Sequence, residues 1–339
     1  MLSKIFSIAD KTVGVDYKPY VIAEAGSNFN QSMDTARKLI DAAAEVNADA
    51  VKFQLFRAEV LDPSKSGLFD VFKSIELNPD WVPKLMDHAK ANSIHFSASA
   101  FDLRSVEILE EVGVPFHKIA SSETSNLPLV HKIASTGKPV LISTGMCDMV
   151  DIEEAINVCQ GVGNDRIVIM QCGTIYPLPQ ELTNLKVLKS FASRFGGVLG
   201  FSDHTDGLAA APVAIGLGAT VFEKHFTLDK KSEGPDHSYA IEPKQLEDYI
   251  NTIHEAHLSL GSSEKSMLDD EKKGGRREGL YAGKDLKVGH QLCHSDIESK
   301  RPAVGMRARY LQTVIGATIV KNIPKGHHLT WDVLSFEEK

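Results

Sequence analysis

Short apolar runs rich in β-forming residues recur eight times along the chain, and segments with helical periodicity separate them. The predicted strands are 21–25, 50–54, 95–98, 116–120, 140–143, 167–171, 198–202 and 220–225. In the first helical segment, Ala36, Leu39 and Ile40 fall on one face, while Arg37 and Asp41 fall on the other. Eight alternations of strand and helix within about 245 residues predict a parallel (β/α)8 barrel, also called a TIM barrel.

The main alternative to a closed barrel is a doubly wound open sheet. Further helical patterns occupy 81–91, 105–112, 129–135, 152–160, 182–195, 207–217 and 243–260, and they suit either architecture. A dinucleotide-binding sheet would carry a glycine-rich turn after its first strand. This chain has Glu24-Ala25-Gly26-Ser27-Asn28 at that place, which favours the barrel.

The character of the sequence changes after Leu260. Segments 261–265 and 269–277 are charged, rich in glycine and poor in apolar residues, as is typical of a linker. Beyond them, residues 284–292 are echoed by residues 321–329, and a polar turn follows each copy. We therefore expect a barrel domain over residues 1–265, a linker over 266–279, and a small β-rich domain of two turn-containing units over 280–339.

Composition and charge narrow the class of protein. The net charge of −8 argues against general nucleic-acid binding, although a few lysines in one pocket can still hold an anionic substrate. The first 20 residues lack the apolar core of a signal peptide, and no run reaches the length of a transmembrane helix. The four cysteines form no CxxC pair. We expect a cytoplasmic protein with reduced thiols and no membrane contact.

Polar and charged residues stand at or just after the carboxyl ends of the predicted strands. In a parallel barrel these ends meet at one mouth, where barrel enzymes place their chemistry. The residues concerned are Glu24, Lys52, Gln54, Ser97, Ser99, Lys118, Ser121, Glu123, Thr144, Thr174, Tyr176, Ser202, His204, Glu223 and His225. Charged side chains seldom occupy nearly continuous apolar strands unless they are paired or functional.

Two histidines in this set predict a metal site. His204 and His225 end successive strands, and either one alone would pass for an ordinary surface histidine. Together they predict an open site that water or substrate oxygens complete, since a structural zinc site would have four protein ligands. Manganese is the favoured ion, with cobalt or magnesium as alternatives, and a sphere of nitrogen and oxygen also suits zinc.

Two lysines in the set predict an anion site. Lys52 and Lys118 lie within apolar strands, so their ammonium groups can reach the barrel mouth and hold a phosphate or a carboxylate there. The alternative is a structural ion pair with Glu24 or Glu123, because buried ion-pair networks also occur.

With these residues in place, the chain resembles the sialic acid synthase (N-acetylneuraminate synthase) family. The matching stretches occur in family order at 22–26, 51–54, 118–123, 143–146, 175–177, 202–205, 224–227 and 234–236. The tail, with Lys300-Arg301-Pro302 and its glycine turns, is similar to the C-terminal antifreeze-like (SAF, β-clip) domain of that family. The resemblance implies a metal-dependent transferase that condenses phosphoenolpyruvate with an N-acylated amino sugar to give a nonulosonic acid and phosphate.

The resemblance also implies roles for individual residues. The catalytic residues are Glu24, Glu123, His204 and His225, of which the two histidines bind the divalent metal ion. The phosphoenolpyruvate ligands are Lys52, Ser99, Lys118, Ser121, Thr174 and Ser202. The sugar ligands are Gln54, Tyr176, Asp236 and Arg301. In the family the matching arginine reaches into the barrel of the partner subunit, which implies a domain-swapped homodimer.

Several positions depart from the pattern of the family. Phe29 and Gln31 replace the histidine and glycine of an Asn-His-x-Gly turn near the sugar, and Thr174 replaces an asparagine that helps to bind phosphoenolpyruvate. Gly279 stands where serine is common. The amino sugar therefore stays open among N-acetylmannosamine, its 6-phosphate and a diacetamido-trideoxyhexose.

Three other functions compete with this one. A related aldol-type synthase would use phosphoenolpyruvate with a phosphorylated sugar, but the tail and the segment Ser202-Asp203-His204-Thr205 favour the sialic acid group. A non-catalytic carbohydrate-binding protein would not need both lysines and both histidines. A barrel-type metal hydrolase would carry His-x-His on its first strand, where this chain has Glu24-Ala25-Gly26.

Overall fold

The computed structural model divides the chain into two compact units, Met1–Gly261 and Ser262–Lys339. It describes residues 1–63, 67–273 and 275–336. One residue of the predicted linker, at position 274, and the last three of the predicted small domain lie outside these ranges. Within them, no helix combines the length and the apolar character that a membrane span requires.

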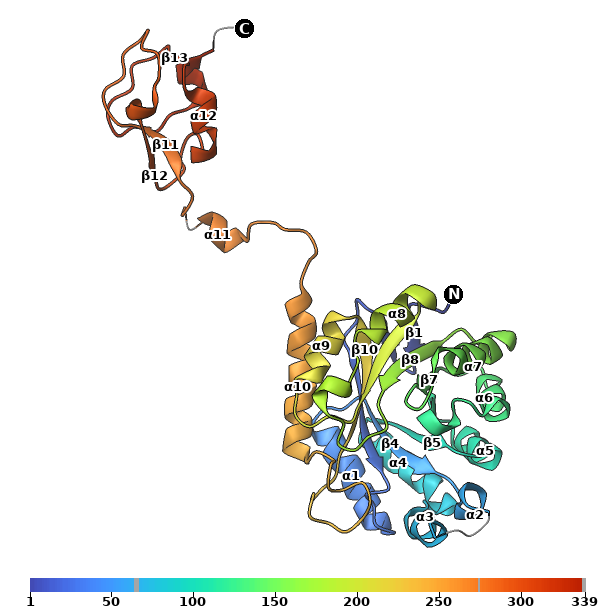
Figure 1. The fold of residues 1–339 in the computed structure, drawn as a ribbon. Helices are drawn as coiled ribbons and strands as arrows, with labels where there is room; N and C mark the ends of the chain where they lie inside the picture. Colours follow the sequence, from blue (N-terminus) through green and yellow to red (C-terminus); the bar gives the residue numbers. More distant parts are fainter. Residues whose placement is uncertain (64–66, 274, 337–339) are drawn as a thin grey trace. The chain divides into compact units, whose positions relative to one another are not determined.

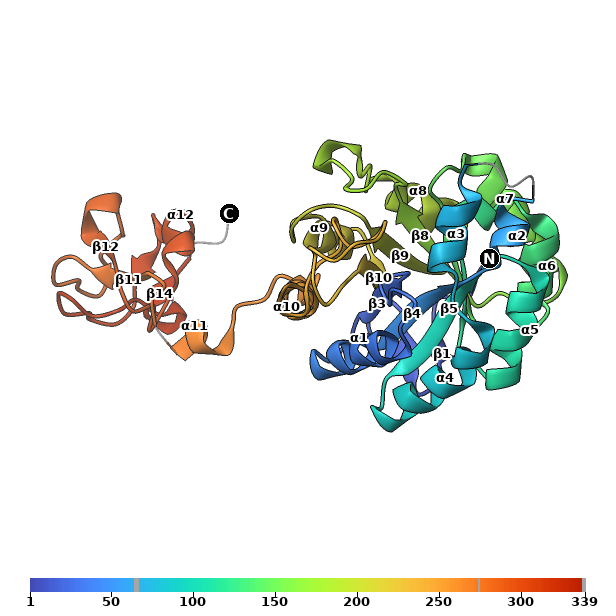
Figure 2. The same ribbon diagram turned by 90° about the horizontal axis from the view of Figure 1, so that it is seen from below.

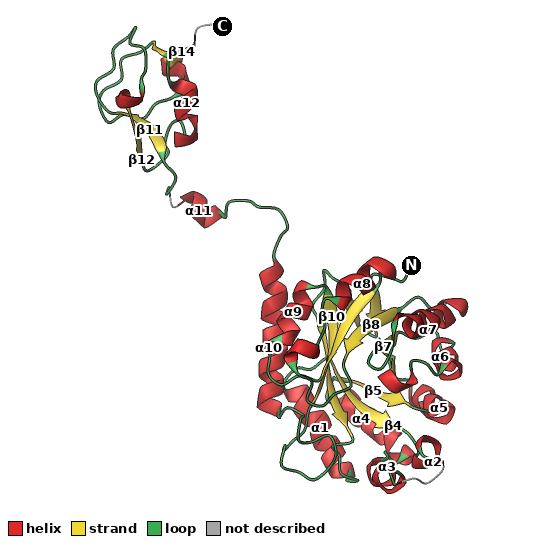
Figure 3. Ribbon diagram, viewed as in Figure 1, coloured by secondary structure: helices red, strands yellow, loops and turns green. Residues whose placement is uncertain are grey.

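Eight parallel strands of the first unit close into a barrel, in the order β10-β3-β4-β5-β6-β7-β8-β9 (Figures 1 and 3). The strands are β3 (Tyr20–Gly26), β4 (Ala50–Leu55), β5 (His95–Ala100), β6 (His117–Ile119), β7 (Val140–Ser143), β8 (Ile167–Cys172), β9 (Val198–Asp203) and β10 (Ala219–His225). Each of the eight predicted strands has a counterpart here, and the prediction of a (β/α)8 barrel is confirmed.

Helices surround the strands, as the view in Figure 2 shows. They are α1 (Met33–Glu45), α4 (Val82–Ala91), α5 (Leu103–Val112), α6 (Leu127–Ala134), α7 (Met149–Gly161), α8 (Val187–Arg194), α9 (Ala210–Gly216) and α10 (Pro243–Leu260). The helix predicted over 182–195 was too long at its start. A 3-10 turn at Gln180–Leu182 precedes α8 instead, and Asn184 between them has a left-handed φ of 48°, which an α-helix does not accommodate.

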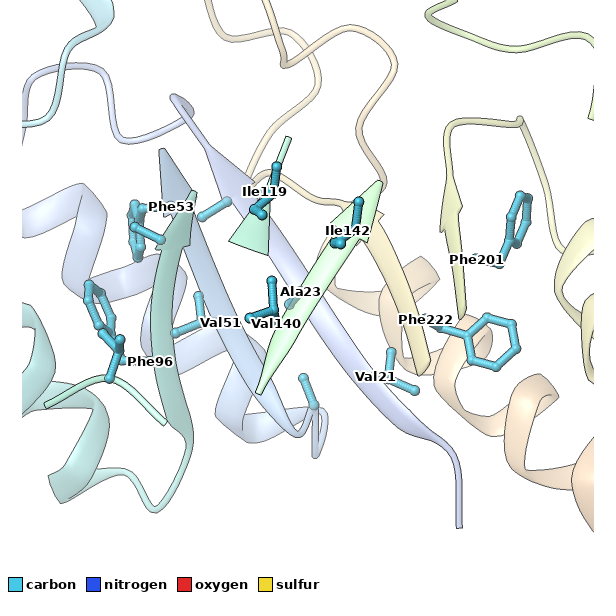
Figure 4. Packing of buried hydrophobic residues seen from close by; sticks show 14 of the residues in the cluster. Val21, Ala23, Val51, Phe53, Phe96, Ile119, Val140, Ile142, Phe201 and Phe222 are labelled. Carbon is cyan, nitrogen blue, oxygen red and sulfur yellow. The ribbon is translucent and has the colours of Figure 1, made fainter. Parts of the chain in front are cut away.

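Successive side chains of each strand face alternately outward and inward, so they form two separate layers of packing. Outward-facing residues of the strands, among them Val51, Phe53, Phe96 and Phe222, pack under the helices (Figure 4). Inward-facing apolar residues fill the lower part of the barrel instead, and their cluster includes Tyr20, Ile22, Ala50, Phe116, Leu141, Val168, Met170, Val198 and Val221. Because every second side chain of a strand faces inward, the next inward-facing residue of each strand lies above this cluster, toward the carboxyl end.

Two features of the first unit were not predicted. An antiparallel hairpin of β1 (Phe6–Ile8) and β2 (Lys11–Val13) adds Phe6, Ile8 and Val13 to the cluster inside the barrel. Two short helices, α2 (Ala58–Leu61) and α3 (Phe69–Ile75), lie between β4 and α4. No residue of α3 is fully buried, although Phe69, Phe72 and Ile75 are spaced as on one face of a helix.

The second unit is a small β-rich fold with its own core. Its strands are β11 (Gly279–Ala282), β12 (Ile297–Lys300), β13 (Thr318–Ile319) and β14 (Leu334–Ser335), with α12 (Leu311–Val314) between them. The two copies of the sequence repeat meet where Leu286 and Ile323 exchange backbone hydrogen bonds of 2.8 and 2.9 Å. The prediction of a β-rich domain with paired turn units is confirmed, while the charged segment before it contains a short helix, α11 (Asp269–Lys273).

Candidate active site

A cavity of about 670 Å³ opens at the carboxyl ends of the barrel strands. Its lining includes most of the residues predicted for the site, namely Glu24, Lys52, Gln54, Ser99, Lys118, Ser121, Thr174, Tyr176, Ser202, His204, His225 and Asp236. The strand residues among them follow the inward apolar residues at a spacing of two, as Glu24 follows Ile22 and Lys52 follows Ala50. The alternation that fills the lower barrel with apolar side chains thus fills its mouth with polar ones.

Four charged side chains form a network at the floor of this cavity. Lys52 Nζ lies 2.7 Å from Glu24 Oε2 and 3.7 Å from Glu223 Oε2. Lys118 Nζ lies 3.4 Å from Glu223 Oε1. All four side chains are at most 5% exposed. Glu223 therefore bridges the two lysines. The sequence suggested Glu24 or Glu123 as ion-pair partners of these lysines, and the structure has Glu24 and Glu223 as the partners.

Two carboxylates in this network have opposite pKa shifts. Burial raises the pKa of Glu24 to about 7, and the attraction of Lys52 offsets this only in part. Burial also acts to raise the pKa of Glu223, but Lys118 and Lys52 outweigh it and lower that pKa to about 2. For Lys52, burial acts to lower the pKa, and the two glutamates raise it overall. Near neutral pH the network has two ammonium groups, one firm carboxylate and a partly protonated one, and this balance favours an anionic ligand.

Serine hydroxyls line the cavity together with the charged network. Lys52 Nζ donates to Ser99 Oγ at 2.9 Å, and Ser202 Oγ donates to Glu223 Oε1 at 3.3 Å. Ser121 Oγ accepts from the backbone N–H of Gly145 at 3.0 Å. A phosphate bound between the lysines would find hydroxyl donors beside the ammonium groups, which is the type of site that phosphate oxygens require.

The two histidines stand together at the carboxyl ends of β9 and β10. Their ring centroids are 5.3 Å apart. His204 Nδ1 lies 2.6 Å from the carbonyl oxygen of Gly173, which requires a proton on Nδ1, so Nε2 is the ring nitrogen that a metal ion would use. Burial lowers the pKa of His225 to about 3, so its ring is neutral, and its buried Nδ1 has no hydrogen-bond partner. Burial acts to lower the pKa of His204, but its contacts with Cys172 and the Gly173 carbonyl raise it overall. A neutral imidazole with an unshared nitrogen atom, as in His225, is suited to a divalent metal ion.

The two histidines are the protein ligands that such an ion would find here. Among the residues that the structure describes, no group of three or more His, Cys, Asp or Glu side chains converges on one point. A closed structural site, which would have four protein ligands, is therefore not found among these residues.

Aromatic and acidic side chains form another part of the lining. Tyr176 packs on His204 and on Tyr239, with ring centroids 4.3 and 4.9 Å apart. Asp236 Oδ1 accepts from the hydroxyl of Tyr239 at 2.6 Å, and its Oδ2 accepts from Ser27 Oγ at 3.0 Å. Burial acts to raise the pKa of Asp236, but His225, Tyr239 and Ser27 lower it overall. An ionised carboxylate held by such contacts is a suitable acceptor for substrate hydroxyls.

Ser97 and Thr144, which were also predicted at the barrel mouth, are not among the lining, and neither are two residues with an implied role. Glu123 follows β6 in the 3-10 turn Ser121–Glu123, where it is mostly buried and accepts from Ser122 Oγ at 2.6 Å. Arg301 belongs to the second unit, where its side chain is 65% exposed and lies 3.8 Å from Glu278. The first unit by itself therefore brings together the predicted metal and phosphoenolpyruvate ligands, but not these two side chains.

The sequence assigned no role to Glu223, did not point to Ser122, Ser143, Ser238 and Tyr239 of the lining, and placed Phe29 wrongly. Glu223 was noted at a strand end without a role, although it precedes His225 by two residues and so shares its inward face. Tyr239 lies in a loop, where no periodicity marks it. Phe29 does not reach the cavity. It is fully buried against Phe53 and Trp81, so the substitution at this position serves packing.

Two family models and several known relatives match this chain. The model of the NeuB family matches residues 39–265, and that of the SAF domain matches residues 277–335. The N,N'-diacetyllegionaminic acid synthase of Campylobacter jejuni is 37% identical over 323 residues, which cover 90% of this chain and 97% of that enzyme. The human N-acetylneuraminate-9-phosphate synthase is 33% identical over 270 residues, which cover 76% of this chain and 75% of that enzyme.

A solved structure has the same fold over nearly the whole chain. The spore coat polysaccharide biosynthesis protein SpsE of Bacillus subtilis is 34% identical, with a TM-score of 0.70, and the match covers 98% of this chain and all of that one. The family model spans more than half of the sequence, and several relatives exceed 30% identity over most of it. The chain belongs to the NeuB family and carries a SAF domain at its C-terminal end.

Proposed function

We propose that this protein condenses phosphoenolpyruvate with the aldehyde of an N-acylated amino sugar to give a nonulosonic acid and inorganic phosphate. The observation that carries the proposal is the buried pair Lys52 and Lys118 below the paired histidines, within one cavity of a NeuB-family barrel. Relatives named as synthases of N,N'-diacetyllegionaminic acid, pseudaminic acid and N-acetylneuraminate 9-phosphate support the reaction type.

Phosphoenolpyruvate would bind at the floor of the cavity. The two lysines act as point charges for its phosphate and carboxylate, and the hydroxyls of Ser99, Ser121, Thr174 and Ser202 supply hydrogen bonds. Because these groups are buried and already held by one another, they need little rearrangement when the substrate arrives. The floor then holds the enol carbon of phosphoenolpyruvate facing the aldehyde.

The aldehyde would bind at the rim, where Gln54, Tyr176 and Asp236 present an amide, a hydroxyl and a carboxylate. C3 of phosphoenolpyruvate attacks the aldehyde carbon, whose oxygen takes up a proton, and water adds to C2. Cleavage of the C–O bond to phosphate then releases the nonulosonic acid. Glu24 is suited to orient that water or a substrate hydroxyl, since with a pKa of about 7 it can accept or donate a proton. We assign a similar orienting role to Glu123.

The residues present fit a divalent ion, which we propose to be manganese, with cobalt or magnesium as alternatives. His204 and His225 would hold it through their unshared ring nitrogens. When bound, such an ion polarises a carbonyl oxygen and orients substrates. The neutral state of His225, caused by its burial, keeps the ligand available at all pH values well above 3.

We further propose a cytoplasmic homodimer in which Arg301 of one subunit completes the sugar site of the other. Arg301 is exposed within its own unit, so a guanidinium group is available for a partner molecule or for a substrate. An arginine can bind the carbonyl or hydroxyl oxygens of an acylated sugar with several hydrogen bonds at once.

The first prediction tests the reaction itself. Purified protein with manganese should release inorganic phosphate from phosphoenolpyruvate only when an N-acylated hexosamine-type aldehyde is present. Phosphate is measured colorimetrically, and the sugar product by mass spectrometry. Removal of the metal with a chelator should reduce the rate at least tenfold, because the aldehyde loses its polarising ion. Release of phosphate without any sugar, or a full panel of amino sugars without product, would refute the proposal.

A further inference from the structure

The turn between β3 and α1 contains two consecutive non-glycine residues in the left-handed conformation. Asn30 has a φ of 48° and Gln31 a φ of 51°. Asparagine tolerates this region because its short side chain bonds locally, whereas glutamine has no such advantage. Strained residues persist where surrounding contacts hold them, and they concentrate at functional sites. The contacts of these two side chains therefore indicate what the strain supports.

Asn30 holds one of the segments that line the cavity. Its Oδ1 lies 3.0 Å from Nε2 of His237, whose Nδ1 lies 2.7 Å from Oγ1 of Thr227. His237 is only 2% exposed, whereas Asn30 itself is exposed. The loop around it supplies Pro235, Asp236, Ser238 and Tyr239 to the cavity.

Gln31 holds another of these segments. Its Nε2 donates an exposed hydrogen bond of 2.7 Å to the carbonyl oxygen of Glu76, the C-cap residue directly after α3. The carboxylate of Glu76 in turn accepts from the backbone N–H of Ala58 at 3.0 Å and from Lys73 Nζ at 2.5 Å. The end of α3 is thus connected both to α2 and to the strained turn.

Helix α3 supplies an apolar surface to the cavity. Val71, Phe72 and Ile75 are among the lining residues, and Val71 is 45% exposed. Phe72 packs edge-on against Phe56, with ring centroids 6.1 Å apart, but no residue of α3 is fully buried. The hydrogen bonds at the end of this helix, that of Gln31 with the Glu76 carbonyl among them, therefore help to fix its position.

We propose that Gln31 is a positioning residue that holds α3 as the apolar wall of the aldehyde site. This wall selects an aldehyde with an apolar substituent, either an acyl methyl group or a deoxygenated carbon, over one with a hydroxyl at the same place. A hydroxyl set against Val71, Phe72 and Ile75 would lose water without gaining a hydrogen-bond partner. The inference rests on the proposed function, because it concerns the second substrate of that reaction.

The connection is tested with Gln31→Gly and Gln31→Glu. Glycine adopts the left-handed conformation without strain, so the melting temperature of Gln31→Gly should not fall. Glutamate keeps the length of the side chain but loses the N–H donor. Both variants should raise the KM for the aldehyde about fivefold while kcat and the KM for phosphoenolpyruvate stay within about twofold, because only the aldehyde wall is loosened. Amide hydrogen exchange in residues 69–75 should become faster in both.

The matched control is Asn47→Gly. Asn47 is exposed, has a left-handed φ of 59° and follows the opposite end of α1, so this variant also introduces glycine at a left-handed position, but away from the cavity. Its kinetic constants and its exchange in residues 69–75 should match those of the wild type. An aldehyde KM that stays unchanged in both Gln31 variants would overturn the positioning role.

The selectivity is tested with two matched pairs of aldehydes. One pair differs by a hydroxyl on the acyl group, and the other by the hydroxyl on carbon 6. The wild type should favour the more apolar member of at least one pair by about tenfold in kcat/KM, and the pair concerned identifies the substituent at the wall. Val71→Asn should reduce this preference, whereas Val60→Asn should not, since Val60 is similarly exposed but does not line the cavity.

The outcomes separate this inference from the proposed function. Turnover without any preference, or a preference that Val71→Asn leaves intact, would overturn the apolar wall while the condensation stands. A complete lack of product with every amino sugar would refute the proposed function instead. In that case, amide hydrogen exchange in residues 69–75 of the Gln31 variants still shows whether Gln31 holds α3.

Discussion

Glu24 and Glu223 show how neighbouring buried residues of one type acquire different chemistry. Both side chains face the barrel mouth and are at most 5% exposed. Glu24 contacts Lys52, whereas Glu223 lies near both Lys52 and Lys118. The second lysine decides the balance against burial, so Glu223 stays ionised and Glu24 titrates near neutral pH.

At the scale of single residues, we predict that Glu223→Gln destabilises the folded protein. This change leaves two buried ammonium groups with one carboxylate, so the free energy of unfolding should fall by about 3 kcal/mol. Added phosphoenolpyruvate should raise the melting temperature of the variant more than that of the wild type, because the anion replaces the lost charge.

Thermal unfolding with and without phosphoenolpyruvate is the measurement. Glu298→Gln, at an exposed carboxylate of the second unit, is the control and should change neither value by much. Equal stabilisation of wild type and Glu223→Gln by phosphoenolpyruvate would mean that Glu223 does not border the anion site.

At the scale of elements, a side-chain cluster joins α5 to the start of β6. His117 Nε2 and Lys138 Nζ both lie 2.7 Å from Glu110 Oε1. The hydrogen bond from His117 lowers the pKa of Glu110 from its ordinary value of 4.5 to about 2, although burial opposes it. His117 faces outward from the barrel, so this cluster fixes a helix against its strand and does not belong to the cavity.

The cluster predicts a pH dependence of stability. Because the pKa of Glu110 is lower in the folded chain, its contribution is fully present above pH 4.5 and is lost as the pH falls toward 2. Glu110→Gln should therefore lose stability at pH 7 but show a shallower decline than the wild type between pH 5 and pH 2. Urea unfolding across this range is the measurement, and parallel declines would contradict the assignment.

The elements also show which parts of the fold a sequence reveals. Each barrel strand was predictable, because its apolar run is buried on both faces and ends in polar residues. The hairpin β1–β2 and helix α3 were not, because each is short and each owes its position to contacts made far away in the sequence. Phe6 and Ile8 pack against residues such as Leu141 and Val198, which no local pattern connects to them.

At the scale of the whole molecule, the proposed dimer predicts complementation between two inactive variants. Lys118→Ala removes a ligand of the barrel, and Arg301→Ala removes the proposed contribution of the second unit. Each alone should lose most activity, with Arg301→Ala acting mainly on the KM of the sugar. Mixed subunits that exchange should recover about a quarter of the wild-type rate, since half of the dimers would hold one intact site.

The mixing experiment needs a control for subunit exchange. Unfolding and refolding the two variants together ensures random pairing, and size-exclusion chromatography with light scattering reports the oligomeric state. No recovery after verified exchange would show that Arg301 serves its own barrel or no site at all.

The sequence by itself determined the barrel, the small β-rich domain and the polar residues at the strand ends, because these follow from periodicities of two and 3.6 and from residue type. Only the tertiary structure decided how those residues act together. It placed Glu223 between two lysines, left a nitrogen of His225 without a partner, removed Phe29 from the cavity and connected Gln31 to α3. The physical reason is that burial and the distances between charges depend on segments that meet only when the barrel closes.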